Sequence, residues 1–175
     1  MKIRRFLSVF LLAVLSVTLS ASPWAAALEE PDIQCKAALL VDAHTGAVVY
    51  AKNEHQELYP ASLTKIMTCL LTLEAIDKGK LDMNQAVTAT ASALEGLPSD
   101  GSTANIQVGE VMTVEHLLYC MMLVSANEAS QILAETISGS VAAFVGEMNA
   151  KAQALGCENT HFVNPHGIHD SQHYT

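Results

Sequence analysis

The sequence predicts an α/β protein of the α+β kind, in which one β-hairpin precedes a set of helices within a single domain. Residues 36–42 and 47–51 are mostly apolar runs of strand length, and the turn residues His44-Thr45-Gly46 separate them. Beyond residue 62, apolar side chains recur at helical spacing. Because a lone hairpin is only marginally stable in water, we expect a helix or further strands to cover it.

The remaining elements follow from caps and glycines. We expect helices over residues 62–78, 113–127, 128–137 and 140–156, and short strands over residues 86–90 and 105–108. Thr113 and Ser140 are predicted N-caps, and Gly79, Gly139 and Gly156 are predicted to end helices. The helix over residues 62–78 is apolar nearly all round, which predicts a buried, central position. No helix is expected in residues 157–175.

Residues 1–27 have the pattern of a secretory signal peptide. A basic start precedes an apolar run over residues 6–21, and Ala25-Ala26-Ala27 supplies small residues before a predicted cut at Leu28. An uncleaved membrane anchor is the alternative, although the run is short for a full span. We therefore expect export to the cell envelope or secretion, which leaves residues 28–175 as the mature part of the chain.

The mature chain is strongly acidic. It would keep all 18 acidic residues and lose three of the nine basic ones, because Lys2, Arg4 and Arg5 lie in the leader. Nucleic acids and anionic lipids are poor partners for such a surface. We expect no nucleic acid partner, and nothing in the sequence calls for a cofactor.

Ser62 and Lys65 are candidates for a nucleophile and its base. Three residues along a helix correspond to a rise of roughly 4.5 Å and about 300° of rotation, so the two side-chain tips can meet. A serine hydroxyl needs a base, and burial lowers the pKa of a lysine enough for it to act as one. In the simpler alternative, Ser62 caps the helix and Lys65 extends to the surface.

Ser125-Ala126-Asn127 supplies a second pair of candidates. A serine can relay a proton and an asparagine amide can bind a carbonyl group, and both lie at a predicted helix junction. The alternative is a helix end followed by the N-cap of the next helix.

Three segments, residues 59–68, 123–129 and 159–167, together resemble the low-molecular-mass D-alanyl-D-alanine carboxypeptidases, which are penicillin-binding proteins. The resemblance implies a β-lactamase/DD-peptidase-like fold. It also implies that Ser62 attacks the bond between the terminal D-alanines of a peptidoglycan stem peptide and that Lys65 takes its proton. Ser125 would relay a proton and Asn127 would bind the substrate amide. β-Lactams would acylate Ser62, and no metal or other cofactor is implied.

The family's third motif, Lys-Thr-Gly on a strand, occurs nowhere in the sequence. We therefore expect the chain to be the amino-terminal part of such an enzyme, without the carboxyl-terminal strands of its sheet. By itself it should be poorly folded and nearly inactive. The family often carries a carboxyl-terminal membrane anchor, so membrane association through a segment beyond these residues is a further expectation.

Three other functions remain open. A class A β-lactamase would need a Glu-x-x-Leu-Asn loop, and the sequence has none. A non-catalytic envelope protein that binds peptidoglycan would explain the absent motif. A metal-binding protein is suggested by the side chains crowded in the tail, which are Cys157, His161, His166, His169, Asp170 and His173.

The cysteines allow a structural prediction. Cys69 and Cys120 fall in apolar helical stretches, so we expect both to be buried and close together. Cys35 and Cys157 complete the four, and their spacing indicates no dense disulfide framework.

Overall fold

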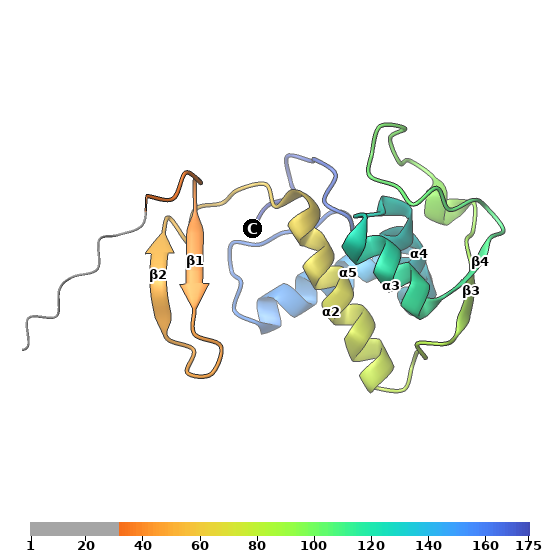
Figure 1. Cartoon of the computed structure of the whole chain (residues 1–175), viewed down its shortest axis with the longest axis horizontal. Coiled ribbons are helices and arrows are strands. Elements are labelled where there is room, and N and C mark those ends of the chain that lie inside the picture. Colours follow the sequence, from red (N-terminus) through yellow and green to blue (C-terminus); the bar gives the residue numbers. More distant parts are fainter. Residues whose placement is uncertain (1–31) are drawn as a thin grey trace, which may run out of the picture.

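The structure is a computed structural model that describes residues 32–175, so the predicted signal peptide lies outside the described residues. A hairpin stands beside a body of helices (Figure 1). In chain order the elements are β1 Ala38–Val41, β2 Val48–Lys52, the 3₁₀ turn η1 Ala61–Leu63, α2 Thr64–Asp77, β3 Ala86–Thr88, the 3₁₀ turn η2 Ser92–Leu94, β4 Val111–Thr113, α3 Val114–Leu123, α4 Asn127–Ser138 and α5 Val141–Ala154. The α+β architecture agrees with the prediction.

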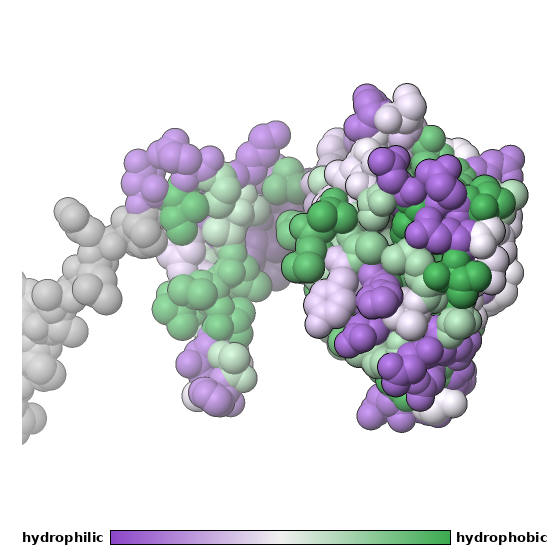
Figure 2. Space-filling view, turned by 45° about the vertical axis from the view of Figure 1, so that its right-hand side comes forward, coloured by the Kyte–Doolittle hydropathy of each residue, from purple (hydrophilic) through white to green (hydrophobic). Residues whose placement is uncertain are grey.

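The β1–β2 hairpin confirms the expected antiparallel pair, with Ala38 opposite Lys52. Asp42 stabilises the turn by accepting hydrogen bonds from the backbone and side chain of Thr45. Within residues 32–175 the hairpin remains a two-stranded sheet, and Figure 2 shows apolar side chains over much of it. The exposed side chains are Leu39, Leu40, Val41, Val48 and Val49. The cover expected for it is therefore not supplied by the described residues.

The central helix is α4 and not α2, which corrects the prediction. Every residue of α4 from Asn127 to Ala134 is buried, and α4 packs against α2, α3 and α5. In contrast, α2 leaves Ile66 59% and Leu73 44% exposed. The apolar pattern of α2 misled the prediction because its buried face carries hydroxyl groups.

That buried face of α2 is a row of threonines, spaced one helical turn apart. Thr64, Thr68 and Thr72 are each at most 1% exposed. Thr68 Oγ1 donates to the Pro165 carbonyl at 2.6 Å, and Thr64 Oγ1 is bonded to His173 Nε2 at 2.7 Å. Burial is tolerated because the tail supplies partners for Thr64 and Thr68, while Thr72 Oγ1 donates to the Thr68 carbonyl of its own helix.

Two apolar clusters meet at α4. One joins α3, α4 and the β3–β4 pair around Leu117, Met121 and Leu133. The other joins α2, α4 and α5, and Phe144 and Phe162 lie at its centre. Since both clusters include residues of α4, they hold this helix in place relative to α2 and α3.

The predicted strand over residues 86–90 is confirmed as β3, but the strand predicted over residues 105–108 is wrong. The partner of β3 is β4, which pairs Ala86 with Thr113. Gly109, with φ +86°, turns the chain ahead of β4, and its N–H donates to the Ala89 carbonyl. The apolar residues before that glycine therefore belong to the approaching loop.

Local cap chemistry was predicted well. Thr113 accepts a hydrogen bond from the His116 N–H, and Ser140 accepts one from the Ala143 N–H. Gly139 ends α4 in the left-handed conformation with φ +78°. These caps lie in the chain itself, so the sequence shows them directly.

The tail has no helix, as expected, and it crosses the amino-terminal end of α2 (Figure 1). His161 and Tyr174 form a β-bridge, and Leu58 and Thr175 exchange two backbone hydrogen bonds of 3.0 Å. Among the described residues, no group of three or more His, Cys, Asp and Glu side chains is arranged to hold a metal ion. His166 and His173 are instead buried in contacts with α4 and α2.

The cysteine prediction was only partly right. Cys69 and Cys120 are half-buried rather than buried, although both pack against the cluster around Leu117. Burial raises the pKa of both thiols.

In residues 32–175, no helix combines the length and the apolar character needed to cross a membrane.

Candidate active site

The structure brings the four predicted site residues together at the meeting point of η1, α2 and α4. Ser62 lies in η1, two residues before α2, so the predicted helix start at Ser62 was too early. Lys65 is in the first turn of α2, and Ser125 and Asn127 flank the start of α4. Ser125 has φ +60°, an uncommon conformation for a residue other than glycine, and such strain concentrates at functional sites.

Lys65 is the buried centre of the site. Its side chain is only 2% exposed, and Nζ donates to Asn127 Oδ1 at 2.8 Å, to the His166 carbonyl at 2.8 Å and to Ser62 Oγ at 3.3 Å. Burial lowers the pKa of Lys65 from 10.5 to about 8, and the Glu128 carboxylate opposes this shift. The predicted lysine with a depressed pKa is present, and its amine lies within reach of Ser62.

Ser62 presents its hydroxyl to an open hollow. Ser125 Oγ donates to Ser62 Oγ at 2.9 Å, while Lys65 Nζ approaches the same oxygen. The hollow has a volume of about 300 Å³, and Met121 and Met122 form part of its wall beside the two serines. A nucleophile in this position is accessible to a ligand and contacts two proton-transferring groups.

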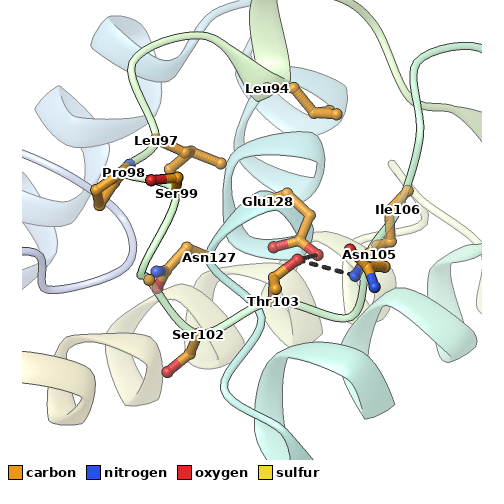
Figure 3. Close-up of a pocket in the computed structure, with 11 residues that line it drawn as sticks. Leu94, Leu97, Pro98, Ser99, Ser102, Thr103, Asn105, Ile106, Asn127 and Glu128 are labelled. Atoms are coloured by element: carbon orange, nitrogen blue, oxygen red, sulfur yellow. Dashed lines mark hydrogen bonds between the residues drawn. The ribbon is translucent and has the colours of Figure 1, made fainter.

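Asn127 is held from two sides. Its side-chain Oδ1 accepts from Lys65, and its backbone N–H donates to the Ser102 carbonyl at 3.0 Å. The neighbouring Glu128 accepts a hydrogen bond of 2.7 Å from Thr103 Oγ1, which Figure 3 shows, and a second of 2.7 Å from the Ala104 N–H. These bonds attach residues 101–104 to the first turn of α4, and a second cavity of about 220 Å³ lies between the two.

The tail contributes a contact that the sequence did not reveal. The His166 carbonyl binds Lys65 because Asn164 shapes a tight turn, in which its Oδ1 accepts from the Gly167 N–H at 2.6 Å. Gly167, with φ +88°, packs against the backbone carbonyl of Ala61. The Asn-Pro-His-Gly pattern is a turn signal that indicates such a bend, but no side chain indicates where its carbonyl points.

The two buried histidines of the tail are held neutral. Burial and, to a lesser degree, the Lys65 charge lower the pKa of His166 to about 4, so His166 adds no second cation beside Lys65. Burial also lowers the pKa of His173. Because His173 Nδ1 accepts from the Val163 N–H, the proton of the neutral ring is on Nε2, which donates to Thr64.

The chain is similar to known proteins over nearly its whole length. Residues 24–175 match the family described as D-alanyl-D-alanine carboxypeptidase. The chain is 40% identical to the D-alanyl-D-alanine carboxypeptidase DacF of Bacillus subtilis, over 98% of this chain and 44% of that protein. It is 36% identical to DacA of Haemophilus influenzae, over 97% of this chain and 43% of the relative.

Solved structures show the same fold. Penicillin-binding protein 5 of Haemophilus influenzae superposes with a TM-score of 0.80 at 37% identity, covering 85% of this chain and 43% of that one. A DD-transpeptidase of Streptomyces K15 superposes with a TM-score of 0.75 at 29% identity, covering 83% of this chain and 58% of that one. The chain spans less than half the length of the curated relatives that it matches. It belongs to the D-alanyl-D-alanine carboxypeptidase family, as the resemblance of its three sequence segments had indicated.

Proposed function

We propose that this chain carries the acylating part of a serine-type D-Ala-D-Ala carboxypeptidase that trims peptidoglycan stem peptides. The observation that supports this most directly is the position of Ser62 Oγ, which is 3.3 Å from the amine of buried Lys65 and 2.9 Å from the Ser125 hydroxyl. A serine with both a base and a second hydroxyl in contact is equipped for acyl transfer.

Lys65 acts as the base. With a pKa of about 8, roughly a tenth of its side chains are neutral at pH 7, against about one in three thousand for an ordinary lysine. The neutral amine takes the proton of Ser62 as Ser62 Oγ attacks the carbonyl carbon of the penultimate D-alanine. Asn127 and the His166 carbonyl hold the amine in place during this step.

Ser125 and Asn127 complete the acylation. As the peptide bond breaks, the proton passes from Lys65 through the Ser125 hydroxyl to the nitrogen of the departing D-alanine. The side-chain amide of Asn127 donates to an amide carbonyl of the substrate. Water then hydrolyses the ester on Ser62, which releases the shortened peptide and restores the hydroxyl.

β-Lactams would enter the same path, because their strained amide bond is attacked in the same way. The leaving nitrogen stays attached to the opened ring, so the ester persists.

We also propose that residues 1–27 direct export to the cell envelope, supported by their basic start and apolar run.

The test is covalent labelling of the purified chain by a fluorescent penicillin, followed by mass spectrometry of the labelled peptide. We expect slow labelling at Ser62, because the sequence has no Lys-Thr-Gly motif to bind the carboxylate of the ligand. Ser62→Ala should abolish the label. Ser130→Ala is the matched control, since Ser130 is fully buried in α4 and its hydroxyl bonds only to the Ala126 carbonyl among the described residues.

The outcomes separate the candidate functions. A lasting adduct on Ser62 supports the carboxypeptidase. Rapid release of a hydrolysed penicillin would indicate a β-lactamase instead. Undiminished labelling of the Ser62→Ala variant, or no label at all, would overturn the proposed acylation and leave a non-catalytic binding protein as the better interpretation.

A further inference from the structure

Gly101 occupies a position where the space, and not the backbone conformation, demands a glycine. Gly101 does not have a positive φ, so a residue with a side chain could adopt its backbone conformation. A Cβ atom built there would lie 2.9 Å from Asn127 Nδ2 and 3.2 Å from the Pro98 carbonyl oxygen. The residue that would be disturbed first is therefore the asparagine of the candidate active site.

The side-chain amide of Asn127 has one end occupied and one end open. Oδ1 accepts the hydrogen bond of Lys65, which leaves the NH₂ group facing away from the lysine. Within residues 32–175 no acceptor is bonded to this NH₂ group. It is not among the fully buried atoms, because every fully buried polar side-chain atom of these residues has a hydrogen-bond partner, so the nitrogen keeps some accessible surface. It borders the cavity that Gly101 also lines.

The amide cannot simply move away from a new neighbour. Lys65 holds its oxygen, and the bond from the Asn127 N–H to the Ser102 carbonyl keeps the loop against α4. Figure 3 shows the Asn127 side chain directed at the loop that carries Pro98 and Ser99. A methyl group at position 101 would therefore lie against the open NH₂ group.

We propose that Gly101 is a specificity-determining residue, because it keeps the NH₂ group of Asn127 free to donate to an amide carbonyl of the ligand. The inference rests on the proposed function, since it concerns the acyl donors that react with Ser62. It names their class: compounds that carry an acylamide next to the reacting unit, as a peptide does. Ligands without that carbonyl do not use this hydrogen bond.

Two β-lactams test this. Benzylpenicillin has the acylamide, whereas 6-aminopenicillanic acid has the same fused rings and carboxylate but a bare amine. In Gly101→Ala, we expect the acylation rate of Ser62 by benzylpenicillin to fall about tenfold, the effect of losing one hydrogen bond. The rate with 6-aminopenicillanic acid should change less than about twofold. The ratio of the two acylation rates does not depend on how slow the reaction is overall or on which fraction of the protein is folded, because both affect the two rates equally.

Gly146→Ala is the matched control, because Gly146 lies in α5 with nothing within 4 Å of an added Cβ. In Gly146→Ala, the ratio of the acylation rate with benzylpenicillin to the rate with 6-aminopenicillanic acid should equal the ratio in the unsubstituted chain. An equal fall with both β-lactams in Gly101→Ala, or an unchanged ratio, would overturn the role of Gly101. Failure of the unsubstituted chain to react with either compound would overturn the proposed function together with this inference.

A second variant covers the case in which Gly101→Ala does not fold. Adding Asn127→Ala removes the atom that the new methyl group would meet, so the double variant should recover the melting transition of Asn127→Ala alone. If the double variant also fails to fold, the glycine serves the loop backbone and not the amide of Asn127, and the inference is wrong.

Discussion

The amine of Lys65 donates a hydrogen bond to the carbonyl oxygen of His166, which lies 101 residues further along the chain. The Asn127 side chain approaches the same amine from 62 residues away. The position of the base is thus determined by α4 and the tail as much as by its own helix. Its pKa is determined in the same way, because these elements exclude water from it.

The rate of acylation should rise with pH as Lys65 loses its proton. Since burial lowers its pKa to about 8, the neutral base is scarce below that pH and predominates above it. Single-turnover labelling of Ser62 by benzylpenicillin, measured from pH 6 to pH 10, should therefore be half-maximal near pH 8. A flat profile, or a midpoint near the 10.5 of an ordinary lysine, would show that Lys65 is not the base.

Glu128→Gln is the matched variant for this measurement. The carboxylate favours the charged form of Lys65, so removing its charge should move the midpoint to lower pH. Glutamine keeps a side-chain oxygen for Thr103 and Ala104, which limits the effect on structure.

Gly167→Ala should damage both stability and acylation. An added Cβ would fall 1.8 Å from the Ala61 carbonyl oxygen, directly before Ser62, and the φ of +88° is unfavourable for alanine. We expect a loss of at least ~2 kcal/mol in the free energy of unfolding, measured by urea denaturation.

Gly46→Ala separates the two causes of that loss. Gly46 also has a positive φ, of +71°, but nothing lies within 4 Å of an added Cβ. Its variant should show the conformational cost alone and an unchanged rate of labelling. Equal losses in the two variants would mean that the contact with Ala61 is unimportant.

Thr68→Val should cost about 1–3 kcal/mol of unfolding free energy, because it leaves the buried Pro165 carbonyl without its hydroxyl donor. Valine has nearly the same shape, so the change in packing is small. Thr72→Val is the comparison: Thr72 is equally buried, but its hydroxyl bonds to the Thr68 carbonyl of its own helix. Thermal or urea unfolding of both should show the larger loss in Thr68→Val.

The features that could be predicted from the sequence are those that depend on residues close together in the chain. The hairpin turn, the caps at Thr113 and Ser140, and the end of α4 at Gly139 each follow from a few adjacent side chains. The pairing of Ser62 with Lys65 is equally local, being one helical turn. Ser125 and Asn127 were predicted by resemblance, and the structure places them in contact with that pair.

The features that could not be predicted from the sequence depend on contacts between residues far apart in the chain. On the threonine face of α2, the hydroxyls of Thr68 and Thr64 find their hydrogen-bond partners in the tail. The carbonyl of His166 was missed because every residue has one, and a sequence carries no mark of its direction. Gly101 was overlooked for a similar reason, since its importance lies in the space beside Asn127.

The contacts of Lys65 also determine when the site can form. Closing loops of 62 and 101 residues costs conformational entropy before any contact repays it, and such long-range contacts slow folding. During synthesis, a nascent chain that has emerged only as far as Gly139 contains Ser62, Lys65, Ser125 and Asn127 but not yet the His166 carbonyl. The contact between Lys65 and the His166 carbonyl can therefore form only after the tail has been translated and has folded across α2.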